Sequence, residues 1–578
     1  MRSREEIRNY LLNGEIKLAT VSGVLTTKPA LIRRIDEDVP AISVITTKSY
    51  QVRPNPGNRE PIVAEVEPGS YINAVGLRNP GMQTAFRELR ALLKESPLRA
   101  LLNISVSGNS PEEFIRLVKK FSPIADILEL NFSCPHAQPG YGASIGSDAK
   151  LVAEYLRAIR AMTDRPLFPK LTPNVKNIAE IARAAVQAGA DGIVAVNTFG
   201  PEAYREPQSG ELLLYNPNDH KGGLSGEHIF DRALQKVREI REALGPDIPL
   251  IGMGGVSKGA QLRLMQKAGA NVVGIGSAFA RVKTRDYQSY LEALIFDAEN
   301  HTDSAAAFVS VKRQAKYRPY RVVEAKHLSA GMLTLELEGE AFLFEAGQYA
   351  FLWIPGAGEK PLGLVSSSPL RFIIRKREHD PAKRAGEFTH AAFQIREGDT
   401  VYVRGPYGKC PPLNSKTNAL ILSGGTGVAL VPRLAEHLNS LGRIVRVFHG
   451  VIDEKEAAYR ELIENYAEYR LIPDKGKPGR VLDALSEVLD TLEKEDCAVY
   501  AIGPDILMEK ALALAVEKGC ASACCFASLE NNHMCGIGMC GECECGGVLS
   551  CKDGTFYDYE FLKKHYFPSI SSDTNTER

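Results

Sequence analysis

Five cysteines near the end of the chain have the spacing of an iron–sulfur site. They lie between Cys535 and Cys551, and Cys535, Cys540 and Cys543 follow the pattern Cys-x4-Cys-x2-Cys. In plant-type [2Fe–2S] sites this spacing places three thiolates on one loop, and a fourth cysteine further along completes the set. The three glycines of the same segment allow the loop to bend and bring its amide N–H groups towards the cluster sulfurs. The spacing therefore predicts a [2Fe–2S] cluster.

Two cysteines compete for the fourth ligand position. We predict Cys535, Cys540, Cys543 and Cys551 as the ligands, and Cys545 either replaces Cys551 or is a buried thiol. A structural zinc site and a disulfide framework are the alternatives, but zinc sites usually carry paired Cys-x2-Cys arms and disulfide frameworks belong to small secreted domains. A one-electron centre has no substrate of its own, so the rest of the chain must supply an electron donor and an acceptor.

The composition indicates a mixed-charge enzyme. The chain has 578 residues, and its 70 Lys and Arg residues balance 70 Asp and Glu residues. This length predicts roughly three or four domains, and a balanced charge argues against nucleic acid or an anionic membrane as a partner. No apolar run approaches the roughly 18 residues that span a bilayer, and no signal-like apolar segment follows Met1. We expect a cytoplasmic homo-oligomer that acts on small molecules.

The first half of the chain has the rhythm of a barrel. Eight short apolar runs predict strands at Lys17–Ser22, Ala41–Thr47, Leu101–Val106, Asp126–Phe132, Leu167–Leu171, Gly192–Val196, Pro249–Met253 and Val272–Gly276. Amphipathic helices are predicted between several of them, at Pro111–Phe121, Ala149–Met162, Asn177–Ala188 and Ala260–Ala268. Alternating strands and helices indicate a parallel sheet, and eight such units close into a (β/α)8 TIM barrel.

Active sites of such barrels lie at the carboxyl ends of the strands. Polar residues follow the predicted strands at these ends: Ser22-Gly23, Thr47-Lys48-Ser49, Asn131 to His136, Lys170, Asn197-Thr198, Gly254-Gly255 and Gly276-Ser277. Glycines after the last two strands favour a phosphate site built from backbone N–H groups, and a phosphorylated cofactor such as FMN suits it. The alternative for these glycines is a pair of tight turns.

Cys134 stands apart from the other cysteines, because the remaining ten all follow residue 400. Its place after a predicted strand makes it a candidate base, since a thiol with a pKa near 8.5 can act at neutral pH when its surroundings lower that value. A buried structural cysteine is the alternative.

The motifs of this half resemble the dihydroorotate dehydrogenase family, class 1. They are Thr46-Thr47-Lys48-Ser49, Asn73 to Gly81, Asn131-Phe-Ser-Cys134-Pro, Lys170-Leu-Thr-Pro, Asn197-Thr198 and Gly222-Gly223-Leu-Ser225-Gly226. The resemblance implies that Cys134 takes a proton from C5 of dihydroorotate while a hydride leaves C6 for N5 of FMN.

The resemblance and the strand ends together give two sets of contacts. The substrate contacts are expected from Lys48, Asn73, Gly76, Leu77, Asn131, His136, Asn197 and Thr198. The FMN contacts are expected from Ser22, Gly23, Lys48, Lys170, Gly226, Gly254, Gly255, Gly276 and Ser277. Asparagine amides suit a pyrimidine ring because each offers a donor and an acceptor.

His136 departs from the commonest family pattern, in which asparagine is frequent at this position. Cys134-Pro-His136 also resembles dihydropyrimidine dehydrogenases, so the reduction of uracil, thymine or a related ring is an alternative. Otherwise His136 only orients its neighbours.

The second half begins with short alternating runs that predict a small antiparallel barrel. These runs are Tyr320–Lys326, Met332–Leu337, Tyr349–Ile354, Leu370–Arg375 and Thr400–Arg404. A strand, a glycine turn at Gly424 to Gly427 and a helix over Ala429–Leu438 follow. This order resembles the ferredoxin reductase superfamily, and most closely the electron-transfer subunit of class 1B dihydroorotate dehydrogenases.

That resemblance implies FAD and NAD(H) as further cofactors. FAD contacts are expected from Lys360, Pro361, Leu362, Gly386 and Thr389, and Gly363 lacks the hydroxyl that is usual in the flavin motif. Nucleotide contacts are expected from Gly424, Gly425, Thr426, Gly427, Gly503 and Pro504, and Ile502 replaces a family cysteine. Asp453 and Glu454 favour NADH over NADPH because they repel a 2′-phosphate, unless they simply begin a helix.

The sequence thus predicts four domains: 1–312 for FMN, 313–415 for FAD, 416–517 for NAD and 518–578 for the cluster. The hypothesis is a single-chain oxidoreductase of pyrimidine biosynthesis that interconverts dihydroorotate and orotate with NAD(H) through FMN, [2Fe–2S] and FAD. In class 1B enzymes the two halves are separate chains, so their fusion is the main departure. A reductase with a non-catalytic barrel is an alternative.

Overall fold

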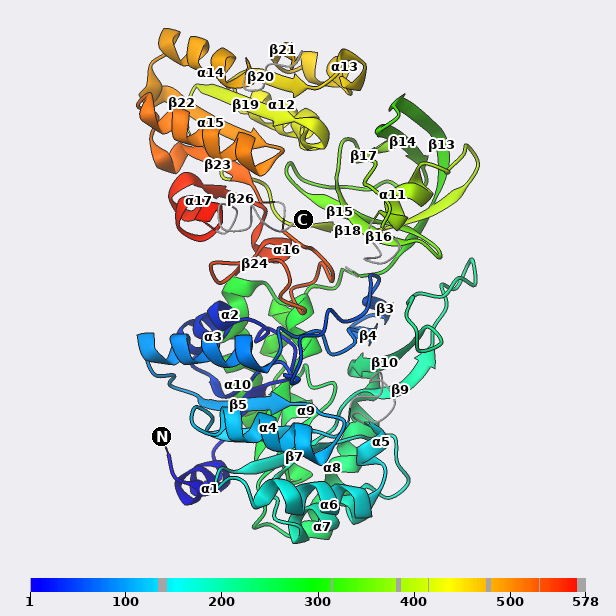
Figure 1. The fold of residues 1–578 in the computed structure, drawn as a ribbon, viewed down its shortest axis with the longest axis vertical. Helices are drawn as coiled ribbons and strands as arrows, with labels where there is room; N and C mark the ends of the chain where they lie inside the picture. The colour runs from blue at the N-terminus through cyan, green and yellow to red at the C-terminus, as the bar shows by residue number, and fades with distance from the viewer. Residues whose placement is uncertain are drawn as a thin grey trace. The chain divides into compact units, whose positions relative to one another are not determined.

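A computed structural model describes residues 2–133, 143–312, 315–380, 386–413, 415–474, 480–529 and 531–568 (Figure 1). The chain divides into two compact units. The first comprises Met1–Lys316 and Ile537–Glu542, and the second comprises Tyr317–Gly536 and Cys543–Arg578.

The first unit contains a closed barrel of eight parallel strands. Its strands are β1 (Leu18–Thr20), β2 (Ile42–Thr46), β5 (Leu101–Val106), β6 (Ile127–Asn131), β7 (Leu167–Leu171), β8 (Ile193–Ala195), β11 (Leu250–Met253) and β12 (Val272–Ile275). β1 pairs with both β2 and β12, which closes the ring. The predicted barrel is confirmed, and each predicted strand matches one of these eight.

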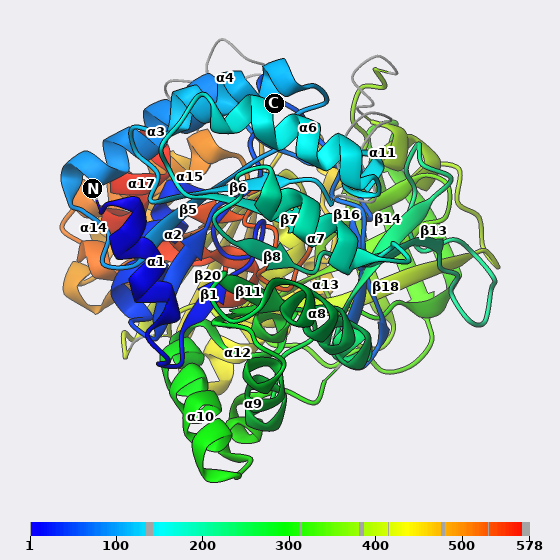
Figure 2. The same cartoon turned by 90° about the horizontal axis from the view of Figure 1, so that it is seen from below.

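Helices surround the barrel (Figure 2). They are α1 (Arg4–Leu12), α2 (Pro29–Asp38), α3 (Met82–Glu95), α4 (Pro111–Phe121), α5 (Ala143–Gly146), α6 (Ala149–Arg160), α7 (Ile178–Gln187), α8 (Phe230–Leu244), α9 (Gly259–Lys267) and α10 (Tyr287–Asn300). In α4, Ser110 caps the first turn by accepting from Glu113 N, and the apolar side chains of Phe114, Leu117 and Phe121 are buried. The helix thus has the N-terminal cap and the single buried apolar face that its sequence predicts.

The inside of the barrel changes from apolar to polar along the strands. Leu101, Ile127 and Phe168 belong to one buried apolar cluster. Two residues further along their strands lie Asn103 and Glu129, both fully buried. Successive side chains of a strand point to opposite faces, so residues two apart share the inner face. The polar layer therefore lies between the apolar core and the carboxyl ends of the strands.

A second sheet in this unit was not predicted. It is antiparallel in the order β3 (Val63–Glu67), β4 (Ser70–Asn73), β10 (Lys221–Gly226) and β9 (Phe199–Ala203). Leu224 pairs with Ile72, and Gly226 pairs with Ser70. The sheet therefore positions two expected site residues, Asn73 and Gly226, at the ends of paired strands.

The second unit begins with six antiparallel strands. They are β13 (Arg318–Ser329), β14 (Met332–Glu338), β15 (Tyr349–Ile354), β16 (Gly358–Gly363), β17 (Leu370–Arg375) and β18 (Thr400–Tyr407), with α11 (Glu387–Ala392) beside them. The five predicted strands are confirmed, and β16 is an addition. The strand order runs from β16 to β17 as a sheet with two end strands, not as a closed ring.

A mixed sheet follows in the order β21 (Glu468–Pro473), β20 (Ile444–Val451), β19 (Asn418–Gly424), β22 (Cys497–Ile502), β23 (Cys525–Ser528) and β26 (Phe556–Asp558). Only β26 pairs antiparallel. Its helices are α12 (Val431–Ser440), α13 (Arg460–Glu464), α14 (Arg480–Thr491), α15 (Asp505–Glu517) and α17 (Tyr559–His565), while β24 (Glu544–Cys545), β25 (Val548–Leu549) and α16 (Ser550–Asp553) follow the cysteine loop. The predicted helix over 429–438 begins later, because a 3-10 helix occupies Gly425–Leu430.

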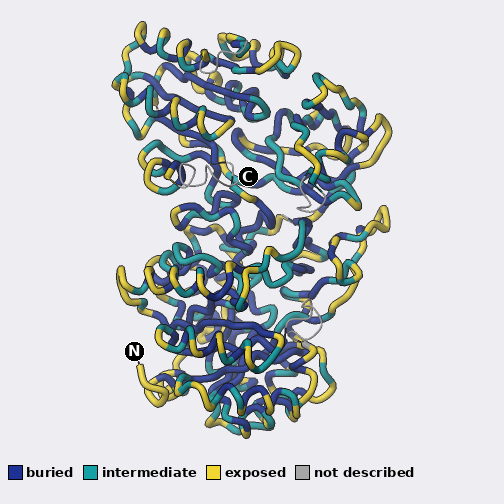
Figure 3. The backbone as a smooth tube through the Cα atoms, in the orientation of Figure 1, coloured by how far each residue is buried: buried dark blue, intermediate teal, exposed yellow. Residues whose placement is uncertain are grey.

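The central strands of both units are buried, and exposed residues concentrate on helices and connections (Figure 3). Within the described residues, no helix combines the length and apolar character needed to cross a membrane.

A buried carboxylate secures the segment that follows α10. Asp297 is fully buried and accepts from Thr302 Oγ1, Ser304 N and Ala305 N at 2.5, 2.9 and 2.8 Å. Burial alone would raise the pKa of Asp297, but these hydrogen bonds lower it to about 2.

We expect Asp297→Asn to lower the thermal midpoint of the full chain at pH 7, because an amide N–H would then face backbone donors. A pKa below its ordinary value of 3.8 contributes stability above that pH and loses it as the pH falls towards 2. The gap between wild type and variant should therefore shrink from pH 5 to pH 3 in a melting series. A gap that is independent of pH would contradict this role.

Candidate active site in the barrel and cysteine loop

Side chains at the carboxyl ends of four barrel strands form one hydrogen-bonded set. Ser22, after β1, lies 3.2 Å from Ser49 between their Oγ atoms. Asn131, at the end of β6, donates from Nδ2 to Ser49 Oγ at 2.9 Å. Ser133 Oγ donates to Asn131 Oδ1 at 3.0 Å, and Asn197, after β8, donates to Ser133 Oγ at 2.9 Å. The structure thus brings together Ser22, Asn131 and Asn197, which are far apart in the sequence.

The two expected lysines are buried near this set. Lys48 and Lys170 are 8% and 5% exposed. Lys170 pairs in register with Asn131, so both belong to the same inner face of neighbouring strands. Gly23 lies beside Lys48, because a Cβ added to Gly23 would be 3.9 Å from Lys48 Cδ. Two ammonium groups here suit an anionic ligand.

Asn73, Gly76 and Leu77 belong to a loop with its own supports. Asn73 Nδ2 donates to Gly223 O at 3.2 Å, and Asn55 Nδ2 donates to Gly76 O at 3.1 Å. Leu77 adopts a positive φ of 56°, which a residue other than glycine rarely does and which marks functional turns. The amide side chains of Asn73 and Asn55 therefore hold the loop that carries these expected substrate contacts. Thr198 donates from its backbone N to Asn197 Oδ1 at 2.8 Å.

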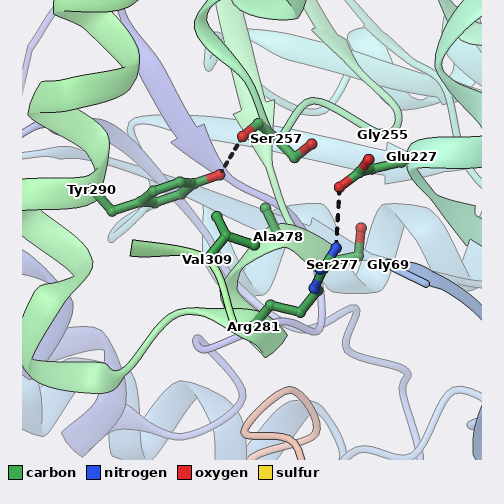
Figure 4. A pocket seen from close by; sticks show the side chains of 9 residues that line it. All are labelled: Gly69, Glu227, Gly255, Ser257, Ser277, Ala278, Arg281, Tyr290 and Val309. Carbon is green, nitrogen blue, oxygen red and sulfur yellow. Dashed lines mark hydrogen bonds and ion pairs between the residues drawn. The ribbon is translucent and has the colours of Figure 1, made fainter. Parts of the chain in front are cut away.

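A pocket lies beside the expected phosphate glycines (Figure 4). Gly255 and Ser277 line it, together with Arg281. Arg281 is held by Glu227 Oε1 at 3.4 Å and by Ser310 O at 2.7 Å.

The expected phosphate glycines also have reasons in packing. A Cβ at Gly254 would lie 2.5 Å from Ala233 Cβ, and one at Gly276 would lie 2.6 Å from Val21 Cγ2. A Cβ at Gly226 would meet Gly69 O, and one at Gly255 would meet Gly226 O. Glycine is required at these turns by close backbone approach, and the backbone N–H groups there remain the expected phosphate donors.

Cys134 and His136 lie outside the described residues. The described part of their loop ends at Ser133, whose N and Oγ both donate to Asn131 Oδ1.

In the second unit, the expected flavin and nucleotide motifs are neighbours. Lys360, Pro361 and Leu362 lie on β16, and a Cβ on Gly363 of the same strand would lie 3.0 Å from Ala429 Cβ. A side chain at Gly363 would therefore crowd Ala429 and Leu430, which follow the glycine turn. Gly386 has a positive φ of 75°, and Thr389 Oγ1 donates to its carbonyl at 3.0 Å.

The nucleotide glycines pack against each other. A Cβ at Gly427 would lie 2.6 Å from Ile502 O, one at Gly503 would lie 2.8 Å from Gly424 O, and one at Gly424 would lie 3.1 Å from Pro504. Gly425 is close to Arg375, and Thr426 lies in the same 3-10 helix. Asp453 Oδ1 caps a 3-10 helix by accepting from Lys455 N at 3.0 Å, so the acidic pair does begin a helical turn.

The cysteine loop is buried and its thiols are not in disulfides. Cys551 Sγ lies 3.3 Å from Cys543 Sγ, and hydrogen bonds with Cys535 and Cys543 raise the pKa of Cys551 well above its usual range. Cys545 instead donates to His565 O at 3.5 Å. Among the described residues, no group of three or more His, Cys, Asp or Glu side chains is arranged to hold a metal ion.

A buried ion pair supports the loop at Cys535. Arg404 on β18 and Glu359 on β16 are fully buried and bonded at 2.6 and 2.8 Å. The guanidinium also donates to Cys535 O at 2.7 Å and to Met534 O at 3.0 Å. Five N–H donors in a planar fork make arginine suited to such a junction.

Known proteins are similar to the first half of the chain, which contains the barrel. The model of the dihydroorotate dehydrogenase family matches residues 14–288. The catalytic subunit of dihydroorotate dehydrogenase B (NAD(+)) from Methanothermobacter thermautotrophicus is 38% identical over 274 residues, or 47% of this chain and 86% of that protein. The same subunit from Methanocaldococcus jannaschii is 38% identical over 257 residues, or 44% of this chain and 81% of that protein.

The chain belongs to the dihydroorotate dehydrogenase family. The prediction of an enzyme, a flavoprotein oxidoreductase, is confirmed with it.

The second half of this family member lies outside the matched residues. A chain from the structure of an NADH-dependent reduced ferredoxin–NADP oxidoreductase covers 44% of this chain and 91% of its own length, at 21% identity and a TM-score of 0.38. A likeness at that score carries no argument about fold or function.

Sequence reasoning missed Ser105, Glu129, Arg281, Glu359 and Arg404. The signal for Glu129 and Arg404 was available, because each is a charged residue within a predicted apolar strand. A charge at such a position is rarely buried without a partner, and it therefore predicts a specific contact.

We expect Arg404→Met to destabilise the second unit of this family member by about 3–5 kcal/mol, because it leaves Glu359 buried without its partner. Chemical unfolding followed by circular dichroism measures the loss. Arg404→Met combined with Glu359→Gln should recover most of it, since no buried charge then remains. If the single and double variants lose equal stability, the ion pair is not what secures this junction.

Proposed function

We propose that this chain interconverts dihydroorotate and orotate with NAD(H), as part of pyrimidine biosynthesis. The observation that carries the proposal is the hydrogen-bonded set of Ser22, Asn131 and Asn197 at the carboxyl ends of a barrel that matches the dihydroorotate dehydrogenase family. Its relatives in that family are named as catalytic subunits of an NAD(+) enzyme.

Amide side chains supply what a pyrimidine ring requires. Asn131 and Asn197 each use one Nδ2–H within the protein, at 2.9 Å from Ser49 Oγ and Ser133 Oγ. Each therefore keeps a second N–H for a ring carbonyl. The buried ammonium groups of Lys48 and Lys170 stabilise negative charge on the ligands, because burial strengthens electrostatic attraction.

Cys134 is the proposed base of the reaction. It follows Ser133, which Asn131 fixes through two hydrogen bonds, so the start of its loop is held against the site. In the oxidative direction the thiolate takes the proton from C5, and the C6–H bond breaks with its electron pair. FMN, when bound, supplies the acceptor for that hydride.

The donors around Gly255, Ser277 and Arg281 suit the phosphate end of FMN. The pocket presents the Arg281 guanidinium, which is paired with Glu227, and the backbone of two glycine turns, and the N–H groups of such turns favour an anion. Gly226, Gly254 and Gly276 complete these turns.

The second half is proposed to pass electrons between the barrel and the pyridine nucleotide. FAD would be held by Lys360 to Leu362, Gly386 and Thr389, and NAD(H) by Gly424 to Gly427, Gly503 and Pro504. The proposed domains are 1–312, 313–415, 416–517 and 518–578. A preference for NADH, a cytoplasmic location and a homo-oligomer remain predictions.

The cysteine loop suits a [2Fe–2S] cluster by its donors. Cys535, Cys540, Cys543 and Cys551 are buried free thiols, and the thiols of Cys535 and Cys543 both contact that of Cys551. Gly536, Gly538 and Gly541 all have positive φ near 75°, so the loop turns where the predicted ligands require it. Thiolate ligands support such a cluster, which supplies one-electron transfer when bound.

Cys551→Ser should abolish the cluster while Cys545→Ser keeps it, because Cys551 Sγ contacts Cys543 Sγ, whereas Cys545 donates to His565 O. Iron analysis and the visible absorbance of each purified full-length variant measure the outcome. If Cys551→Ser retained as much iron as Cys545→Ser, Cys551 would not be a ligand. Loss in Cys545→Ser alone would assign the fourth position to Cys545.

Anaerobic assay of the full chain with dihydroorotate and NAD(+) should give orotate, and Cys134→Ala should lower kcat by at least about 100-fold, because a general base contributes roughly that factor. The orotate formed is measured by its ultraviolet absorbance. Turnover of uracil with none of orotate would replace this function by a dihydropyrimidine dehydrogenase activity. Undiminished turnover in Cys134→Ala would show that Cys134 is not the base.

A further inference from the structure

Glu129 is a buried carboxylate to which the proposed reaction assigns no role. It lies on β6 two residues before Asn131, so both side chains face the inside of the barrel. Glu129 is fully buried, and its Oε1 accepts from Ser105 Oγ at 2.9 Å. Its Oε2 has no hydrogen-bond partner within the described part of the chain. Burial of a carboxylate with one oxygen unpaired costs free energy, so we expect Glu129 to have a specific role.

The carboxylate fixes the direction of the hydrogen bonds that reach it. A serine hydroxyl has one proton, and Ser105 gives its proton to Glu129. Ser105 Oγ must therefore accept from Ser49, which lies 2.9 Å away. Since Ser49 has now used its proton, Ser49 Oγ must accept from its two other neighbours, Asn131 Nδ2 at 2.9 Å and Ser22 Oγ at 3.2 Å.

Backbone N–H groups hold the two asparagine amides in the orientation that this chain requires, because Ser133 N donates to Asn131 Oδ1 and Thr198 N donates to Asn197 Oδ1 at 2.8 Å. Because the Asn131 nitrogen faces Ser49, its Oδ1 faces Ser133 and accepts from Ser133 N and Oγ at 3.2 and 3.0 Å. Ser133 has then used its proton, so its Oγ accepts from Asn197 Nδ2 at 2.9 Å. Every bond in the chain from Asn197 to Glu129 runs in one direction, and Glu129 is the member that can only accept when ionised.

We propose that Glu129 is a positioning residue that sets the proton direction of the serine hydroxyls from Ser105 to Ser49 and Ser22, against which the Asn131 amide donates. Asn131 and Asn197 each keep one N–H to donate, while the carbonyl of Asn131 is saturated by Ser133. Ser22 Oγ gives its proton to Ser49, so it can only accept a hydrogen bond from a ligand. The edge of a ligand that meets the two amides must therefore carry acceptors, such as ring carbonyl oxygens. This inference rests on the proposed function for the identity of its ligand.

The first test measures coupling without any ligand. Glu129→Gln, Ser49→Ala and the double variant are made in the full chain, and their thermal midpoints are compared. Glu129 does not contact Ser49. If the role of Glu129 is purely local, the falls in thermal midpoint of the two single variants should therefore add up in the double variant. If the hydrogen bonds form one directed chain, the double variant should lose less than that sum. When the same variants are made in a chain that already carries Ser105→Ala, the coupling between Glu129 and Ser49 should vanish. Additive losses would overturn the proposal.

The second test uses orotate as the probe. Its Kd is measured by the change in flavin absorbance of the full-length holoenzyme under anaerobic conditions. Glu129→Gln, whose amide can donate as well as accept, and Ser105→Ala should each raise Kd by roughly tenfold, as expected for one misdirected hydrogen bond. The double variant should bind no more weakly than either single variant. KM should rise with kcat nearly unchanged, because the amides bind ground state and transition state alike.

Ser107→Ala is the matched control, because Ser107 is a fully buried serine just beyond β5 whose Oγ has no partner within the described residues. It should leave Kd unchanged. An unchanged Kd in Glu129→Gln or in Ser105→Ala would refute the proposal, and Ser105→Ala decides the matter if Glu129→Gln fails to fold. Failure of the wild-type chain to bind orotate would refute the proposed function instead, and the thermal cycle would still judge the role of Glu129.

Discussion

Closure of the eight-stranded barrel is the constraint on which the site depends. Once β1 pairs with β12, the carboxyl ends of all eight strands must meet around one opening. Ser22, Asn131 and Asn197 are separated by more than sixty residues along the chain, yet the closed ring joins them in one hydrogen-bonded set. Strand alternation then decides which side chains face inward. No local preference of these residues would have assembled them.

Each unit places a charge in its interior where an apolar residue would pack at less cost. In the first unit Glu129 terminates a chain of hydrogen bonds, and in the second Arg404 joins Glu359 to two carbonyl groups beside Cys535. An ion pair of this kind contributes little net stability over apolar residues of equal volume, but removal of one partner is costly. Both charges therefore act by fixing the geometry of groups near a proposed site.

The sequence was sufficient for the parts of the fold that depend on apolar pattern. Eight apolar runs gave the eight barrel strands, and α4 begins and ends at the predicted residues because Ser110 and Pro111 mark its start. The sheet of β3, β4, β10 and β9 escaped prediction because β10 reads Lys-Gly-Gly-Leu-Ser-Gly, which has turn-like composition and no alternation. The roles of Ser105 and Glu129 depend on neighbouring strands of the closed barrel, and a linear pattern contains no such information.

The glycine motifs carry less functional weight than they suggested. At Gly427 and Gly503 a side chain would collide with the backbone of a neighbouring strand or turn, so glycine is required there whether or not a nucleotide binds. In the barrel, a side chain at Gly255 would likewise meet the carbonyl of Gly226, and one at Gly254 would meet the side chain of Ala233. The asparagines are different, because within the described residues Asn131 and Asn197 each use only one Nδ2–H. The N–H groups that they leave unused there are the groups available to a ligand in the proposed function.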